Sequence, residues 1–262
     1  YENPDNDFTT LTAKKGYLYA NSGDGNSNVT TLTFAGTPYN GDGTVLLDYD
    51  ANAQFAGWNL IGNPFGTEAS LNLPFYRMNG DGTGLSAQVE ANSIVGVMEG
   101  VFVKATEPEQ SAIFTTLGNG DCMAPVLNIN VGRNRGTSVD NAIIRFDEGC
   151  QLPKFQLNSN HTKLFIPQGE NSFAVVRSAS EGEMPVNFKA ESNGTYTINF
   201  NAENVKMNYL HLIDNLTGAN VDLLVNPSYT FDAKTTDYAS RFKLVFACGD
   251  ASDDTETFAY YN

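Results

Sequence analysis

Apolar and polar residues alternate with a period of two along most of this chain. In residues 194–200, Tyr196, Ile198 and Phe200 fall on one face while threonine and asparagine fall on the other. This period is typical of half-buried β-strands, because successive strand side chains point to opposite faces, and no comparable window shows a helical period. Similar runs predict strands at 29–34, 44–49, 57–62, 101–105, 126–131, 141–146, 172–177, 208–214, 228–232 and 240–246.

Turn signals separate these runs at short intervals and predict the domain organisation. Asp-Gly or Asn-Gly pairs recur at 24–25, 42–43, 79–80 and 81–82, as hairpins require. The cluster Gly-Asn-Gly-Asp at 118–121, followed by Pro125, is the best internal break. We therefore predict an all-β chain of two antiparallel β-sandwich domains in tandem, at 1–120 and 121–248. The small, acidic segment 249–262 is predicted to be a linker.

The net charge of −15 argues against two classes of partner. With 30 acidic against 15 basic residues, most faces would repel a nucleic-acid backbone or an anionic membrane surface. No apolar stretch is long enough for a membrane helix, and residue 1 lies in a polar run, so we expect neither membrane insertion nor a signal peptide in this sequence. The acidity favours solubility outside the cell, with cation binding as the alternative. We expect a piece of a longer protein whose signal was removed or lies upstream.

Three cysteines are too few for a dense disulfide framework, but two of them are suitably placed to pair. A hairpin of 126–131 and 141–146, centred near residue 136, would bring Cys122 and Cys150 together at its open end. Three free thiols are the alternative, and Cys248 is unpaired under both.

The sequence offers little for histidine-based or motif-based catalysis. The only histidines are His161, in a polar loop-like stretch, and His211, in a predicted strand. Nucleophile-elbow, zinc-protease, phosphate-loop and Cys-x-x-Cys motifs are missing. Neither a cofactor nor a metal site is predicted. A pair of catalytic carboxylates stays open, because only the distance between them would be diagnostic.

The segment 48–59 begins like a calcium-binding loop. Asp48, Asp50 and Asn52 supply oxygen ligands at alternate positions, but Ala53 replaces the glycine of the sharp turn. Asn59 stands where a bidentate glutamate is needed. We therefore expect no calcium requirement for folding.

Aromatic residues near the only tryptophan are the best candidates for a binding surface. Trp58, Tyr17, Tyr19 and Tyr76, with Phe75 beside them, could stack against a sugar ring. Core packing is the alternative, because Trp58 alternates with Leu60 on one face of a predicted strand.

Several segments carry a family resemblance. They include Gly-Trp-Asn-Leu-Ile-Gly-Asn-Pro-Phe at 57–65 and Asn-Tyr-Leu-His-Leu-Ile-Asp-Asn-Leu-Thr-Gly at 208–218, followed by 227–231 and 238–246. Shorter matches lie at 15–20, 142–146 and 152–155. Together they resemble the region that precedes the C-terminal sorting domain in large exported proteins of Bacteroidetes. The resemblance implies type IX secretion, a place at the cell surface or in the medium, and a supporting β-sandwich region. It implies no catalytic residues.

Three hypotheses for the function follow. The first is a non-catalytic structural or adhesive module that contacts other domains of its parent chain and host or matrix proteins. The second is a carbohydrate-binding module that binds a glycan through exposed aromatic rings. The third is a hydrolase that uses two facing carboxylates roughly 5 to 10 Å apart.

Overall fold

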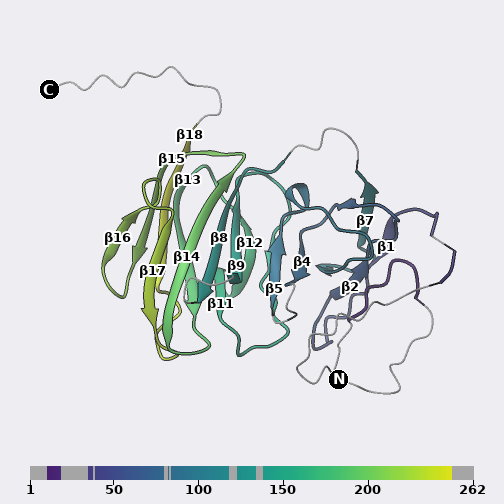
Figure 1. Ribbon diagram of the computed structural model, residues 1–262, viewed down its shortest axis with the longest axis horizontal. Coiled ribbons are helices and arrows are strands. Elements are labelled where there is room, and N and C mark those ends of the chain that lie inside the picture. The colour runs from purple at the N-terminus through teal and green to yellow at the C-terminus, as the bar shows by residue number, and fades with distance from the viewer. Residues whose placement is uncertain are drawn as a thin grey trace. The chain divides into compact units, whose positions relative to one another are not determined.

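The described part of the chain is all-β. The computed structural model describes residues 11–18, 35–37, 39–79, 82, 84–117, 123–133 and 138–249. Within these ranges there is no α-helix, and the helical turn η2, Glu90–Asn92, is a 3-10 helix (Figure 1). The all-β prediction is confirmed for these residues.

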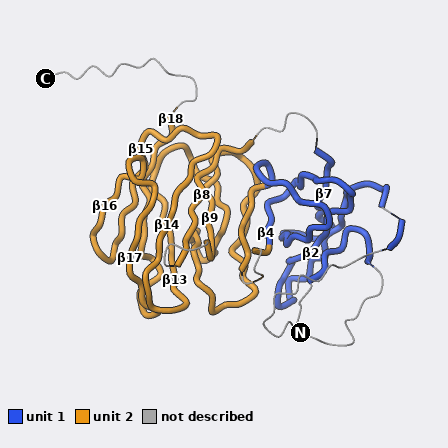
Figure 2. Tube along the Cα trace, viewed as in Figure 1, with its two compact units in different colours: residues 1–77, 90–121 blue, residues 78–89, 122–262 orange. Residues whose placement is uncertain are grey.

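The chain divides into two compact units that are not contiguous in sequence (Figure 2). Unit 1 comprises residues 1–77 and 90–121, and unit 2 comprises residues 78–89 and 122–262. The short segment 78–89 thus clusters with the C-terminal half of the chain. The predicted domains were contiguous and placed this segment in the N-terminal domain. It carries β5 (Leu85–Gln88). The Ala87 amide donates to Asn141 Oδ1 at 2.8 Å, and Asn141 Nδ2 donates to the Ala87 carbonyl at 2.9 Å.

Unit 1 contains short strands in two sheets. One sheet has the order β1 (Thr44–Leu46), β7 (Ser111–Thr116), β3 (Ala69–Leu71). The other places β6 (Gly100–Lys104) between β2 (Trp58–Gly62) and β4 (Phe75–Met78). Both sheets contribute to one buried cluster, since Ile61, Phe75 and Val103 pack in it with Leu71 and Phe114.

Unit 2 is built on one long, folded sheet. Its order is β16-β15-β18-β13-β11-β12-β9-β8-β14-β17, with β10 added beside β12 (Figure 1). The strands are β8 (Val126–Arg133), β9 (Ser138–Arg145), β10 (Leu152–Pro153), β11 (Lys163–Gln168), β12 (Asn171–Arg177), β13 (Glu181–Lys189), β14 (Gly194–Glu203), β15 (Lys206–Asp214), β16 (Ala219–Asp222), β17 (Ser228–Ala233) and β18 (Phe242–Gly249).

Strand β11 forms the corner of this sheet. Its first half, Lys163 to Phe165, pairs with β13, and its second half, Ile166 to Gln168, pairs with β12. The two halves of the sheet can therefore face each other, and the inward side chains of both form a single core. From β8, β9, β12, β14 and β17, the core residues are Leu127, Ile129, Val131, Ala142, Ile144, Val176, Tyr196, Ile198, Phe200, Phe231 and Ala233. From β13, β15 and β18 they are Met184, Val186, Phe188, Leu210, Leu212, Phe242, Leu244 and Phe246. Unit 2 thus has β-sandwich character.

Two pairings test the predicted topology. The hairpin of β8 and β9 is confirmed, because these strands pair antiparallel from Val126↔Arg145 to Gly132↔Ser138. The expectation of wholly antiparallel sheets is wrong at one place, where β12 runs parallel to β9 through Val175↔Ile143. A parallel neighbour requires a crossover connection, and here β10 and β11 lie in the chain between the two strands.

Candidate functional site

The predicted aromatic cluster does not form a coplanar exposed platform among its described members. Tyr76 is fully buried, and the ring of the half-buried Trp58 is tilted by 57° against it at 5.7 Å between centroids. Lys104 Nζ lies 5.7 Å from the Trp58 ring and donates to the carbonyl of Ala56. The Tyr17 hydroxyl accepts a hydrogen bond from the Thr12 amide. Tyr19 lies outside the described residues.

The loop 48–59 is held by internal hydrogen bonds of Asn59 and Asp50. Asn59 Oδ1 accepts the amide of Asp48, and Asn59 Nδ2 donates to the carbonyls of Asp48 and Gly57. Asp50 Oδ1 accepts the amide of Asn52. In the ranges that the structure describes, no group of three or more His, Cys, Asp or Glu residues could hold a metal ion.

This geometry predicts that calcium does not stabilise the fold. The side chain of Asn59 closes the loop by bonding backbone groups of Asp48 and Gly57. A cation bound to Asn59 Oδ1 would have to displace its hydrogen bond with the Asp48 amide. We expect the melting temperature to be the same in excess chelator and in millimolar calcium, measured by circular dichroism. A rise of several degrees with calcium would contradict this, because ligands that bind only the folded state stabilise it by mass action.

Among the residues that the structure describes, the cysteines and histidines do not form a group of three or more possible metal ligands. Cys150 is exposed, Cys248 is partly buried, and both carry free thiols in the structure. Because Cys122 lies outside the described residues, its pairing with Cys150 in the oxidised protein stays a prediction. His161 lies in a turn, with its amide bonded to the Asn158 carbonyl, and His211 lies on β15.

Asn63 explains the Gly-Asn-Pro motif in structural terms. Its buried side chain donates to the carbonyls of Thr67, Val95 and Gly96 at 2.9 to 3.1 Å, and its Oδ1 accepts the amide of Phe65. One amide side chain thus holds its own turn together with the segment before β6. The motif is a local structural lock.

Removing this lock is predicted to destabilise unit 1. Asn63→Ala removes the donor to the Thr67 carbonyl and the acceptor of the Phe65 amide, and an unsatisfied buried polar group costs about 1 to 3 kcal/mol. The unfolding of unit 1 can be followed by the fluorescence of Trp58, the only tryptophan. Asn72→Ala, which removes one exposed bond to the Ile113 amide, is the control and is expected to cost less. Equal losses in the two variants would show that Asn63 is not a lock.

A polar network in unit 2 is centred on Arg241 and Asp214, whose side chains are 2% and 1% exposed. Arg241 Nε donates to Asp214 Oδ1 at 3.0 Å and Nη2 donates to Oδ2 at 2.8 Å, a bidentate arrangement. Arg241 Nη1 donates to the carbonyl of Asp232 at 2.7 Å. The guanidinium also lies 4.5 Å from the ring centroid of Phe231 and 5.3 Å from that of Phe242.

The carboxylate of Asp214 has further donors. The Tyr229 hydroxyl donates to Oδ2 at 3.0 Å and the Leu216 amide donates to Oδ1. The Asp214 carbonyl accepts the amide of Gly218, which adopts the left-handed conformation that closes this hairpin loop. Burial alone raises the pKa of Asp214, but the hydrogen bonds, with that of Arg241 first, and the charge of Arg241 lower it below its usual value.

This network joins residues from three segments that carry the family resemblance: Asp214 from 208–218, Tyr229 and Phe231 from 227–231, and Arg241 with Phe242 from 238–246. The sequence analysis predicted no role for the charged residues of these segments. The available signal was the position of Asp214 at the end of an apolar strand. The side chains of Arg241 and Asp214 at its centre are closed to solvent and hydrogen-bonded, so the network fits a structural role.

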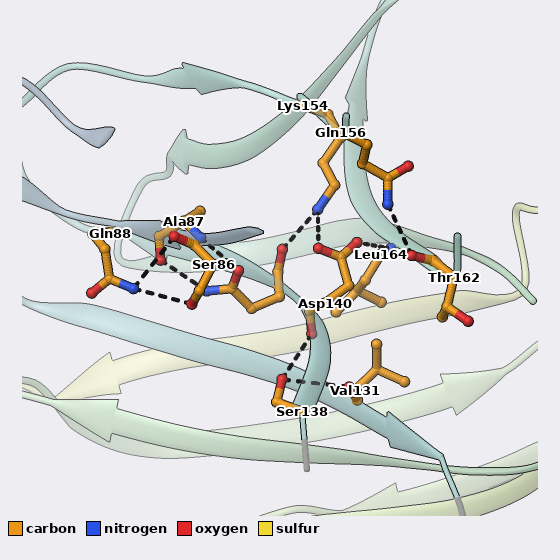
Figure 3. Close-up of polar contacts among 11 residues, drawn as sticks. Ser86, Ala87, Gln88, Val131, Ser138, Asp140, Lys154, Gln156, Thr162 and Leu164 are labelled. Carbon is orange, nitrogen blue, oxygen red and sulfur yellow. Dashed lines mark hydrogen bonds and ion pairs between the residues drawn. The ribbon is translucent and has the colours of Figure 1, made fainter. Parts of the chain in front are cut away.

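A second buried ion pair lies on the core side of β9. Asp140 pairs with Lys154, which directly follows β10, at 2.6 Å between Oδ1 and Nζ (Figure 3). The sequence analysis missed this pair because Asp140 lies on β9 and Lys154 lies after β10, and no local pattern links the two positions. Burial raises the pKa of Asp140, although the charge and hydrogen bond of Lys154 act the other way. Burial likewise lowers the pKa of Lys154 against the opposing effect of Asp140.

One aromatic pair does reach the surface, on β15. Tyr209 is 44% exposed and stacks on His211, with ring centroids 4.4 Å apart and planes 9° apart. His211 Nδ1 lies 2.8 Å from Asn220 Oδ1, and His211 Nε2 lies 4.0 Å from Asp222. A β-bulge between Met207 and Tyr209 lets Met207 pack against the core while Tyr209 faces solvent. The apolar-polar period of the strand did not indicate this pair.

No protein-family model, no curated protein and no solved structure matches this chain. In the described ranges no helix is both long enough and apolar enough to cross a membrane.

Proposed function

We propose that this chain is a non-catalytic structural or adhesive module of an exported bacterial surface protein, built from two β-sandwich domains in tandem. The observation that carries the proposal is the Arg241–Asp214 network. Residues from the segments with the family resemblance meet there in a buried, hydrogen-bonded arrangement that holds strands together. A catalytic group has to touch its substrate, whereas the side chains of Arg241 and Asp214 are inaccessible.

Further support comes from the remaining polar groups. Asn63 and Asn59 act as backbone surrogates, and Asp140 is buried with Lys154. The resemblance adds the context of type IX secretion, the cell surface or medium as location, and host or matrix proteins with the parent chain's other domains as partners. We expect no nucleic-acid partner, because the net charge is −15.

An activity screen tests the non-catalytic proposal. The purified chain is assayed against glycoside, peptide and ester substrates, with no turnover above background expected. The proposal fails if an activity appears that is lost when one carboxylate is replaced by its amide, because such an activity would belong to the chain itself. This outcome would favour the hydrolase hypothesis.

Carbohydrate binding is the second candidate, and Tyr209 favours it. Exposed aromatic rings on sheet faces can stack against sugar rings, and Asn220 and Asp222 lie beside the pair as hydrogen-bonding groups. A glycan array on the intact chain is the primary test. Selective binding that Tyr209→Ala abolishes and Tyr238→Ala retains would promote this function above the structural one; Tyr238 is similarly exposed and serves as the matched control.

A further inference from the structure

Asp140 and Lys154 are placed as two reactants would be. The Lys154 side chain is 0% exposed and that of Asp140 is 3% exposed, so bulk water has no access to the contact. Lys154 Nζ lies 2.6 Å from Asp140 Oδ1 and donates to the carbonyl of Asn141 at 3.1 Å. The Leu164 amide donates to Asp140 Oδ2 at 2.7 Å. Figure 3 shows the amine of Lys154 and the amide of Leu164 meeting the two oxygens of one carboxyl group.

The fold holds these groups from three directions. Asp140 shares the core face of β9 with Ala142, since it is paired with Val131 of β8. The Lys154 amide is bonded to the Ser172 carbonyl at the start of β12. Leu164 lies in the first half of β11, which pairs with β13 and not with β12. Its amide therefore donates to the carboxyl group of Asp140 instead of to a β12 carbonyl. Fixed reactants of this kind have effective concentrations far above those of free groups in solution.

The buried environment favours the reactive protonation states. An ion pair loses its hydration when it is buried. Burial raises the pKa of Asp140 and lowers the pKa of Lys154, and both changes favour the neutral acid and the neutral amine. A neutral lysine amine is a nucleophile, whereas an ammonium is not.

We propose that Asp140 and Lys154 condense to an intramolecular isopeptide bond that cross-links β9 to the segment after β10. Nζ of the neutral amine attacks Cγ of the protonated carboxyl group. The Leu164 amide stabilises the negative charge that develops on Oδ2. The N–H proton passes across the short contact to Oδ1, which leaves as water when the Cγ–Oδ1 bond breaks. One amide and one water are formed, with no oxidant or other reactant. This inference goes beyond the proposed function and does not depend on it.

The chain contains its own control. Arg241 and Asp214 form an equally buried pair at 2.8 Å, but a guanidinium stays protonated and is not a nucleophile. No cross-link is expected there.

The test is mass spectrometry of the purified intact chain under denaturing, reducing conditions. The expected mass is that of the sequence less one water. Trypsin should then fail to cut after Lys154 and should yield a branched peptide that joins 136–145 to 146–163. Linear peptides 146–154 and 155–163, with no branched species, would overturn the proposal.

Two controls separate this bond from other losses of water. Asp-Gly sequences, such as the one at 42–43, can lose water by forming a succinimide. Hydroxylamine cleaves a succinimide but does not cleave an isopeptide bond. Lys154→Arg keeps a cation but cannot condense, and it should show no loss of water that survives hydroxylamine. If Arg is too large for the site, Lys154→Met serves the same purpose. A hydroxylamine-resistant loss of water that persists in both variants would overturn the assignment to Lys154.

Discussion

Arg241→Met lowers the free energy of unfolding of unit 2 by about 3 to 5 kcal/mol, because removal of one partner leaves the Asp214 carboxylate buried without its counter-charge. The variant also loses the bond to the Asp232 carbonyl and the contacts with Phe231 and Phe242. Methionine keeps the apolar stem, so most of the loss is electrostatic. Urea unfolding monitored by circular dichroism measures it.

The control for Arg241 is Lys243→Met, two residues further along the chain on β18. Lys243 forms a partly exposed ion pair with Glu183 at 3.0 Å. Such pairs contribute about 0 to 1 kcal/mol, so this variant should unfold close to the wild type. If the free energy of unfolding falls by the same amount in both variants, burial does not make the Arg241–Asp214 pair more stabilising than an exposed pair.

The same pair predicts an acid-sensitive component of stability. The folded pKa of Asp214 is lower than its ordinary value. Its contribution is therefore fully present above the unfolded pKa of about 4 and is lost as the pH falls through the folded pKa. The difference in stability between the wild type and Arg241→Met should shrink as the pH falls below 4 in a urea series. A difference that grows with acidity would contradict the lowered pKa.

The strands were predictable where one face is buried and the other solvated. All ten predicted runs that fall in described ranges contain or overlap a strand; 29–34 lies outside them. Short strands such as β3 were missed because three residues cannot show a period. Strand β13 was missed although its inward residues alternate, and it contains Pro185, which argues against an inner strand. The structure tolerates this proline because β11 pairs with β13 only at Asn187 to Lys189.

The polar networks were much less predictable. Asp140 lies just before the predicted strand 141–146 and its neighbours in sequence do not indicate burial, but the bulge in the β8–β9 ladder and the register place it in the core. Its partner Lys154 follows another strand, β10, and no local pattern links the two. The bonds between Ala87 and Asn141 also join distant segments, which is why the clustering of 78–89 with unit 2 left no sequence signal.

Phe188→Ala is the second substitution with a large expected effect. Phe188 is buried on β13, with ring centroids 5.1 Å from Tyr196, 5.2 Å from Phe231 and 6.4 Å from Phe242. Its contacts join strands from both halves of the folded sheet. Truncation of a core phenylalanine to alanine removes apolar burial and leaves a cavity, which costs about 3 to 5 kcal/mol. Phe188→Leu fills most of that volume and should cost less than half as much.

This variant also tests whether the two units unfold separately, as tandem domains would. The only tryptophan, Trp58, lies in unit 1, so its fluorescence reports on that unit, while circular dichroism reports on both. We expect Phe188→Ala to move the part of the circular dichroism transition that comes from unit 2 to lower urea and to leave the Trp58 transition in place. Hydrogen exchange should rise in β13, β14 and β17 and not in β2 or β6. A Trp58 transition that moves with the circular dichroism signal would show that the two units unfold as one, because the damage is confined to the core of unit 2.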